Sequence, residues 1–135
     1  RGDMRKLIIV SHGELAAAFL SSLRIIAGGV KDNEYAALGF QANESLDFFT
    51  LRLEKTVKEF DPNNNEIWIL CDIESGTPYN AAYLLSQKYQ LKLIYGLNLA
   101  LLLELSFRKD AITDLELKQL INDSQKTIGL KENEK

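Results

Sequence analysis

The sequence predicts an α/β fold, a three-layer doubly wound sandwich with a mainly parallel four-stranded sheet. Four apolar segments of strand length alternate with segments of helical periodicity along most of the 135 residues. Three of the four apolar segments are nearly continuous Leu, Ile, Val, Trp and Tyr, which is typical of parallel strands covered by helices on both faces. A repeated strand-helix order of this kind favours an open sheet with right-handed crossovers.

The four predicted strands are Lys6–Val10, Glu34–Phe40, Glu66–Leu70 and Leu91–Gly96. The second strand is the least apolar, so we expect it at an edge of the sheet. Because the crossovers are right-handed, the loops that follow the strands all lie at one edge of the sheet.

The first two predicted helices each have one apolar stripe. The first helix ends at the pair Gly28-Gly29, and the second begins after a predicted N-cap at Asn43. The two stripes consist of Leu15, Phe19, Leu23 and Ile26, and of Leu46, Phe49, Leu53, Val57 and Phe60.

The three later helices are recognised by their first residues. Thr77 is a predicted N-cap, followed by Pro78 at the first helical position. Asn98 opens a very apolar helix through Leu105, and Thr113-Asp114-Leu115-Glu116 is a capping box that opens the last helix. The residues expected to face inward are Ala81, Ala82, Leu85 and Tyr89 in the third helix, and Leu117, Leu120, Ile121 and Ile128 in the fifth.

The composition is that of a globular protein, with 46% apolar residues, 26% charged residues and a net charge of -3. These values do not suggest nucleic-acid binding, and no apolar run is long enough to predict direct membrane insertion or a signal peptide. Because Cys71 is the only cysteine, it cannot form an internal disulfide, and we expect a cytoplasmic protein. We expect a single domain over residues 4–130, with residues 1–3 left over from expression and 131–135 as a solvated tail.

The residues best suited to chemistry follow the first and third strands. Ser11-His12-Gly13 ends the first apolar run, and His12 is the only histidine of the sequence. Asp72 begins the loop after the third strand. If the first strand neighbours the third, as in a 2-1-3-4 order, both loops flank the crevice where open α/β sheets bind ligands. His12 and Asp72 would then lie within reach of one another.

A histidine beside a carboxylate can act as a nucleophile. If Asp72 accepts a hydrogen bond from one ring nitrogen of His12, the other ring nitrogen keeps its lone pair free. The helix that begins after His12 favours a bound anion at its N-terminus. Gly13 and Gly76 allow the backbone to approach a ligand closely, and Thr77 offers a hydroxyl. The pattern therefore favours a group that receives phosphate and passes it on.

Three motifs, in order along the chain from Lys6 to about Leu105, carry a family resemblance. They are Ile8-Ile9-Val10-Ser11-His12-Gly13, then Asp72-x-x-Ser75-Gly76-Thr77-Pro78-Tyr79-Asn80-Ala81-Ala82, then Gly96-Leu97-Asn98-Leu99. The chain resembles the mannose-family (mannose/fructose/sorbose) enzyme IIA components of the bacterial phosphotransferase system for sugars. Two positions depart from the family pattern: Ser75 stands where the first glycine of a pair is usual, and Ala100-Leu101 where Pro-Met is common.

The resemblance implies a phosphotransferase component with a phosphohistidine intermediate. His12 would accept phosphate from the histidine phosphocarrier protein and pass it to enzyme IIB, while Asp72 would orient the His12 ring. Thr77 would lie beside the phosphoryl group, and Asn80 would either support the site or only form hydrogen bonds at the start of its helix. We therefore place Gly13, Gly76, Thr77 and Asn80 in a predicted phosphate-binding set.

The resemblance also has implications for assembly. Family members are cytoplasmic homodimers that need no metal, and we expect no cofactor. Some members exchange a C-terminal antiparallel strand between subunits, which the stretch after Leu120 would supply. The sequence contains no IIB domain, so we expect a free-standing IIA subunit.

Two other functions share the same phosphorylation chemistry. One is the phosphocarrier subunit of a dihydroxyacetone kinase, whose second loop resembles Asp-x-Gly-Ser, so that the Gly-Thr-Pro-x-Asn found here favours sugar uptake. The other is a regulatory module whose phosphorylation state is read by a partner. A hydrolase triad is disfavoured because Ser11 directly precedes His12 and no Gly-x-Ser-x-Gly is present. The sequence also lacks the motifs of a metal site and of a nucleotide-binding loop.

Overall fold

The computed structural model of this protein describes residues 4–133. The predictions for residues 1–3 and for the last two residues of the tail lie outside this range. The chain divides into two compact units, Arg1–Leu97 and Asn98–Lys135. The single domain expected over residues 4–130 stays a prediction.

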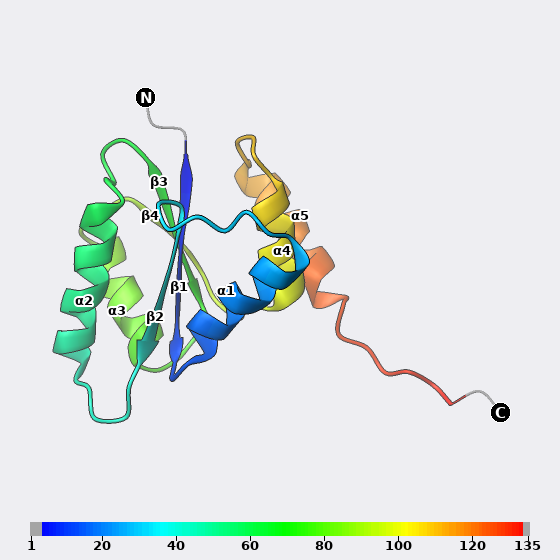
Figure 1. Cartoon of the computed structure of the whole chain (residues 1–135), viewed down its shortest axis with the longest axis horizontal. Helices are drawn as coiled ribbons and strands as arrows, with labels where there is room; N and C mark the ends of the chain where they lie inside the picture. Colours follow the sequence, from blue (N-terminus) through cyan, green and yellow to red (C-terminus); the bar gives the residue numbers. More distant parts are fainter. Residues whose placement is uncertain (1–3, 134–135) are drawn as a thin grey trace. The chain divides into compact units, whose positions relative to one another are not determined.

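The first unit is built on four parallel strands, β1 (Arg5–His12), β2 (Tyr35–Phe40), β3 (Glu66–Cys71) and β4 (Leu91–Ile94). Their order is β2-β1-β3-β4, which confirms the predicted 2-1-3-4 order and the edge position of β2 (Figure 1). The strand β1 continues to His12, two residues further than predicted, and β4 ends at Ile94 rather than at Gly96. The predicted α/β fold class is confirmed.

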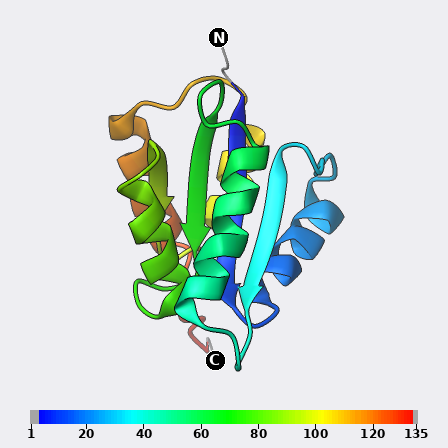
Figure 2. The ribbon, with the colours of Figure 1, turned by 90° about the vertical axis from the view of Figure 1, so that its left-hand side faces the viewer.

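Helices cover both faces of the sheet in this unit. The helix α1 (Leu15–Ile26) lies on one face, and α2 (Leu46–Glu59) and α3 (Thr77–Ser86) lie on the other (Figures 1 and 2). Because side chains alternate along a strand, Ile8, Val10, Ile69 and Cys71 share the face that packs against α2 and α3. The α2 stripe is confirmed, with Phe49, Leu53 and Val57 fully buried in this cluster.

The buried face of α1 differs from the predicted one. The buried residues are Ala16, Leu20 and Leu23, whereas Leu15 and Ile26 are 46% and 55% exposed. The i, i+4, i+7 spacing of the buried set also suits an apolar face, and it brings the small Ala16 against the sheet. A periodicity based on the larger side chains therefore selected the wrong side of the helix, although Leu23 belongs to both sets.

Two predicted N-caps are wrong. The cap of α2 is Ser45, whose side chain accepts a hydrogen bond from Phe48 N at 3.0 Å, and not Asn43. The cap of α3 is Gly76, so that Thr77 is already helical and makes no capping bond with its side chain. The positive φ of +89° at Gly76 places the turn into the helix at this residue, so the helix begins one residue earlier than predicted. Pro78 lies in the first helical turn, as predicted.

The second unit contains α4 (Leu99–Phe107) and α5 (Asp114–Gln125). Both predicted starts are confirmed: the Asn98 side chain accepts a hydrogen bond from Leu101 N at 2.9 Å, and Thr113 forms its capping box with Glu116. Leu117 and Leu120 are buried as predicted, whereas Ile128 lies beyond α5 and is 79% exposed, so its predicted inward position is wrong.

Residues 126–133, which follow α5, lie in neither a helix nor a strand. Strand exchange between subunits stays a prediction. None of the helices in the described range is both long and apolar enough for a transmembrane segment.

Candidate functional site

The predicted juxtaposition of His12 and Asp72 is present. His12 is the last residue of β1, and Asp72 directly follows β3, which pairs with β1 in the sheet. The distance from His12 Nδ1 to Asp72 Oδ2 is 2.9 Å, and the backbone N–H of His12 donates to the same carboxylate oxygen at 3.0 Å. The parallel pairing of β1 with β3 therefore brings together two residues that are 60 positions apart.

The environment of Asp72 keeps its carboxylate ionised. Burial is the largest single influence on the pKa of Asp72 and raises it, because the side chain is only 9% exposed. The hydrogen bonds from His12 N, from the His12 ring and from Ile73 N together outweigh burial and lower the pKa of Asp72 below its ordinary value. An ionised carboxylate only accepts hydrogen bonds, so the hydrogen between the two side chains belongs to Nδ1.

The other ring nitrogen of His12, Nε2, is available to react. With the hydrogen on Nδ1, the Nε2 atom of the neutral ring carries a lone pair and is a nucleophile. The His12 side chain is 45% exposed, so a second molecule can reach it. The site therefore has a fixed tautomer and an open nucleophilic atom.

Gly76 lies directly beside that nucleophile. A Cβ atom at this position would stand 2.7 Å from His12 Nε2 and 3.0 Å from His12 Cε1. The φ of +89° also favours glycine at this position. The backbone at Gly76 thus approaches the His12 ring closely, and the start of α3 lies next to the reactive nitrogen.

The backbone around Gly13 links the end of β1 to α1. The N–H of Gly13 donates to Phe40 O at 2.8 Å, and Gly13 has a φ of +55°. The buried Ser11 accepts a hydrogen bond from Ala16 N on its Oγ at 2.7 Å, which fixes where the helix begins. Ser11 and Gly13, the two neighbours of His12 in the sequence, thus hold the end of β1 in place through these hydrogen bonds.

Thr77 and Asn80 lie in the first turn of α3, which begins at the reactive nitrogen. Thr77 is partly buried, and the backbone N–H of Asn80 donates to Gly76 O at 2.9 Å while its side chain is exposed. Within residues 4–133, no hydrogen bond joins either side chain to the imidazole. The roles of Gly13, Gly76, Thr77 and Asn80 in phosphate binding stay predictions.

One neighbour of the imidazole was missed by the sequence analysis. Phe40, the last residue of β2, is the register partner of His12, and its ring lies edge-on to the imidazole with centroids 6.2 Å apart at 86°. The predicted 2-1-3-4 order contained the signal for this contact. It places the second strand parallel to the first, so the last residue of the second strand lies beside His12.

Cys71 does not contribute a second nucleophile. It is fully buried, and burial, with a smaller contribution from the nearby Asp72 charge, raises the pKa of its thiol to about 12. The thiol therefore stays protonated near neutral pH. Among residues 4–133, no three His, Cys, Asp or Glu side chains are grouped as metal ligands.

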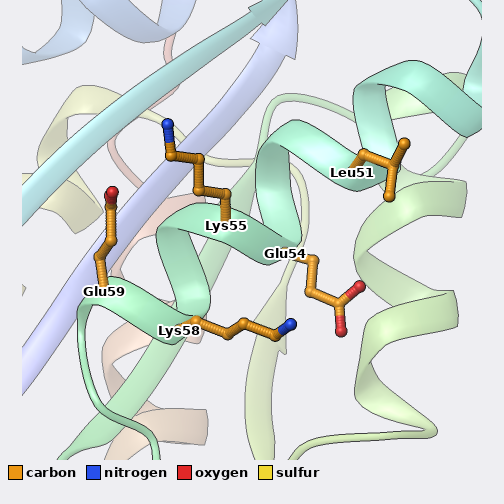
Figure 3. Close-up of a pocket in the computed structure, with 5 residues that line it drawn as sticks. All are labelled: Leu51, Glu54, Lys55, Lys58 and Glu59. Carbon is orange, nitrogen blue, oxygen red and sulfur yellow. The ribbon is translucent and has the colours of Figure 1, made fainter.

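A hollow of about 350 Å³ lies on α2 (Figure 3), and His12 is not among the residues that line it. It is lined by Leu51, Glu54, Lys55, Lys58 and Glu59, which all belong to this one helix. Glu54 is already engaged, because it accepts a hydrogen bond from Tyr89 Oη and pairs with Lys88 Nζ, each at 2.6 Å. This shallow hollow contains no predicted site residue, whereas the histidine lies open at the sheet edge.

The comparisons with known proteins show the family of this chain. Residues 6–123 match the family described as "PTS system fructose IIA component". The sorbose-specific EIIA component of Klebsiella pneumoniae is 35% identical over 73% of this chain and 70% of its own length, and the fructose-specific EIIA component of Bacillus subtilis is 33% identical over 89% and 79%. The solved mannose/sorbose-specific IIA subunit from Enterococcus faecalis superposes with a TM-score of 0.85, at 28% identity over 98% of each chain. The chain therefore belongs to the mannose-type enzyme IIA family of the sugar phosphotransferase system.

Proposed function

We propose that this chain is a phosphoryl carrier that accepts phosphate on His12 Nε2 from the histidine phosphocarrier protein and passes it to enzyme IIB. The observation that carries the proposal is the His12–Asp72 pair, in which an ionised carboxylate occupies Nδ1 and leaves the lone pair on Nε2, in a side chain that is 45% exposed. Family membership supplies the class of reaction, because enzyme IIA components are phosphotransferase subunits.

The transfer is a nucleophilic displacement at phosphorus. The Nε2 lone pair forms a bond to the phosphorus atom of the donor's phosphohistidine while the donor's own N–P bond breaks, and that electron pair returns to the donor imidazole. The hydrogen on Nδ1 stays in place, so the phosphorylated ring becomes positively charged. Asp72, at 2.9 Å from Nδ1, stabilises this charge. The same steps in reverse order deliver the phosphate to the histidine of the acceptor.

The start of α3 is well situated to bind the phosphate. Gly76 is the N-cap of this helix and lies against Nε2, and the first N–H groups of a helix have no partner within the helix. Such N–H groups bind phosphate oxygens favourably. We propose that the first turn of α3, including the Thr77 hydroxyl, and the Gly13 backbone hold the phosphoryl group between the two transfers.

The exposure of His12 favours protein partners. Both the donor and the acceptor must bring a histidine side chain to Nε2, and a half-exposed ring at a sheet edge allows this whereas a closed pocket would not. We infer that both proteins bind the same edge in turn, through weak and transient interfaces, in the cytoplasm. We also expect the homodimer that the family resemblance implies.

A reconstituted phosphorylation assay tests the proposal. We expect the chain to gain one acid-labile phosphate when incubated with phosphoenolpyruvate, enzyme I and the carrier protein, as read by intact mass at alkaline pH. His12→Ala should gain none, because the sequence contains no other histidine. A wild-type chain that stays unmodified, or a His12→Ala chain that gains the phosphate, would refute the proposal.

A second step of the same assay separates the function from its alternatives. On addition of a cognate enzyme IIB, the phosphate should leave this chain and appear on IIB. A chain that accepts phosphate but passes it to no IIB would instead support the regulatory module, and the transport function would be wrong.

A further inference from the structure

We propose that Phe40 is a positioning residue for phosphoryl transfer, holding the His12 ring from the side opposite Asp72. The inference rests on the proposed function and deepens it. Asp72 follows β3 and Phe40 ends β2, and these strands flank β1 on its two sides. The imidazole therefore lies between a carboxylate and an aromatic ring that come from different strands.

A single hydrogen bond does not fix the imidazole. The bond from Nδ1 to Asp72 holds one atom of a ring that is 45% exposed, so the rest of the ring can swing about that point. The Phe40 ring lies at 86° to the imidazole with the centroids 6.2 Å apart. This geometry falls in the favourable range for edge-to-face aromatic pairs. The second contact limits the swing and keeps Nε2 beside Gly76.

Phe40 is itself firmly held. Its ring packs edge-on to Phe49, with centroids 5.8 Å apart at 87°, and Phe49 is fully buried. The Arg52 guanidinium lies 5.2 Å from the Phe49 ring centroid and forms an ion pair with Glu44 at 2.7 Å. Arg52 also donates to Gly39 O, the residue before Phe40, at 2.9 Å. The aromatic neighbour of His12 is thus tied to α2 through both its ring and its backbone.

The backbone supports the same placement. Phe40 is paired with His12 in the β1–β2 register, and its carbonyl accepts the hydrogen bond of Gly13 N at 2.8 Å. A Cβ atom on Gly39 would overlap the Gly13 carbonyl oxygen, so the two strand ends lie in close contact here. The position of the Phe40 ring is therefore set by the sheet rather than by a mobile loop.

The chain has one histidine, so its imidazole signals need no assignment. Carbon relaxation of the imidazole Cε1–H group reports how freely the ring moves, whereas long-range proton–nitrogen spectra report which nitrogen carries the hydrogen. In Phe40→Leu, which keeps an apolar side chain but removes the ring, we expect the imidazole to become more mobile while the hydrogen stays on Nδ1, where Asp72 holds it. Phe40→Tyr, which retains the ring, should restore the wild-type signals. Phe48→Leu is the matched control, because Phe48 lies on α2 and is 56% exposed.

The kinetic expectation is specific to positioning. Phe40→Leu should lower kcat for phosphate acceptance about tenfold and leave KM for the carrier protein unchanged. The reason is that the imidazole is misplaced while the surface that binds the carrier protein is the same. If the leucine variant does not fold, Phe40→Met replaces it. Wild-type mobility of the imidazole or a wild-type kcat in the folded variant would overturn the inference. A wild-type chain that accepts no phosphate would refute the proposed function instead, and the spectra would still test the placement of the ring.

Discussion

Asp72→Asn should slow phosphate acceptance by about 100-fold or more while the chain stays folded. The substitution keeps the size and shape of the side chain but removes its negative charge. In the wild type, Asp72 accepts from His12 N, His12 Nδ1 and Ile73 N. An asparagine has one acceptor oxygen and one donor group, so it satisfies only part of this set.

The loss of rate follows from the wrong tautomer. The amide NH₂ of the asparagine can donate to His12 Nδ1, which then becomes the acceptor and leaves the hydrogen on Nε2. A protonated Nε2 has no lone pair for phosphorus. The variant also lacks the negative charge that stabilises the positive ring after transfer.

The rate of acceptance from the phosphorylated carrier protein, measured by rapid quench, tests this expectation. Asp47→Asn is the matched control, because Asp47 is an exposed aspartate in the first turn of α2 and should keep the wild-type rate. Thermal unfolding monitors folding of both variants. A folded Asp72→Asn chain with the wild-type rate would show that the carboxylate does not orient His12.

Gly76→Ala should also abolish most phosphate acceptance, by about 100-fold, through steric exclusion. The added methyl group would stand 2.7 Å from His12 Nε2, closer than any carbon and nitrogen atoms pack without a bond. The hydrogen bond from Nδ1 to Asp72 at 2.9 Å and the edge-on Phe40 ring together limit how far the imidazole can turn away. Either the imidazole leaves its hydrogen bond or the methyl group covers the nucleophile, and both outcomes block the transfer.

The strain of a side chain at positive φ has to be separated from this clash. Gly29 provides the control, because its φ is +63° and a Cβ atom there would meet nothing within 4 Å. Gly29→Ala should therefore cost about 1–2 kcal/mol of stability and keep the wild-type rate. If Gly76→Ala accepted phosphate as fast as Gly29→Ala, the position of Gly76 beside Nε2 would be wrong.

The sheet and the reactive pair could be predicted from the sequence because their signals are local. Continuous apolar runs mark the strands, and chemistry-bearing residues at strand ends mark the edge where ligands bind. The 2-1-3-4 order then brings His12 and Asp72 together, as the structure confirms. Family motifs strengthened the same prediction, since they contain both residues.

Other features depend on contacts that no single stretch of sequence records. The contact between Phe40 and His12 arises from the register of two strands, and its geometry depends on Phe49 behind it. The inward face of α1 is set by how closely Ala16 approaches the sheet, which side-chain size alone misjudges. The cap at Gly76 depends on a backbone conformation that Thr77-Pro78 does not reveal.

The nitrogen atom that carries the phosphate is the most direct test of the whole account. Proton, nitrogen and phosphorus spectra of the phosphorylated, nitrogen-labelled chain at alkaline pH identify it, since His12 is the only histidine. We predict a phosphorus coupling to Nε2 and a hydrogen retained on Nδ1. Phosphate bound to Nδ1, the atom that Asp72 occupies, would contradict the account.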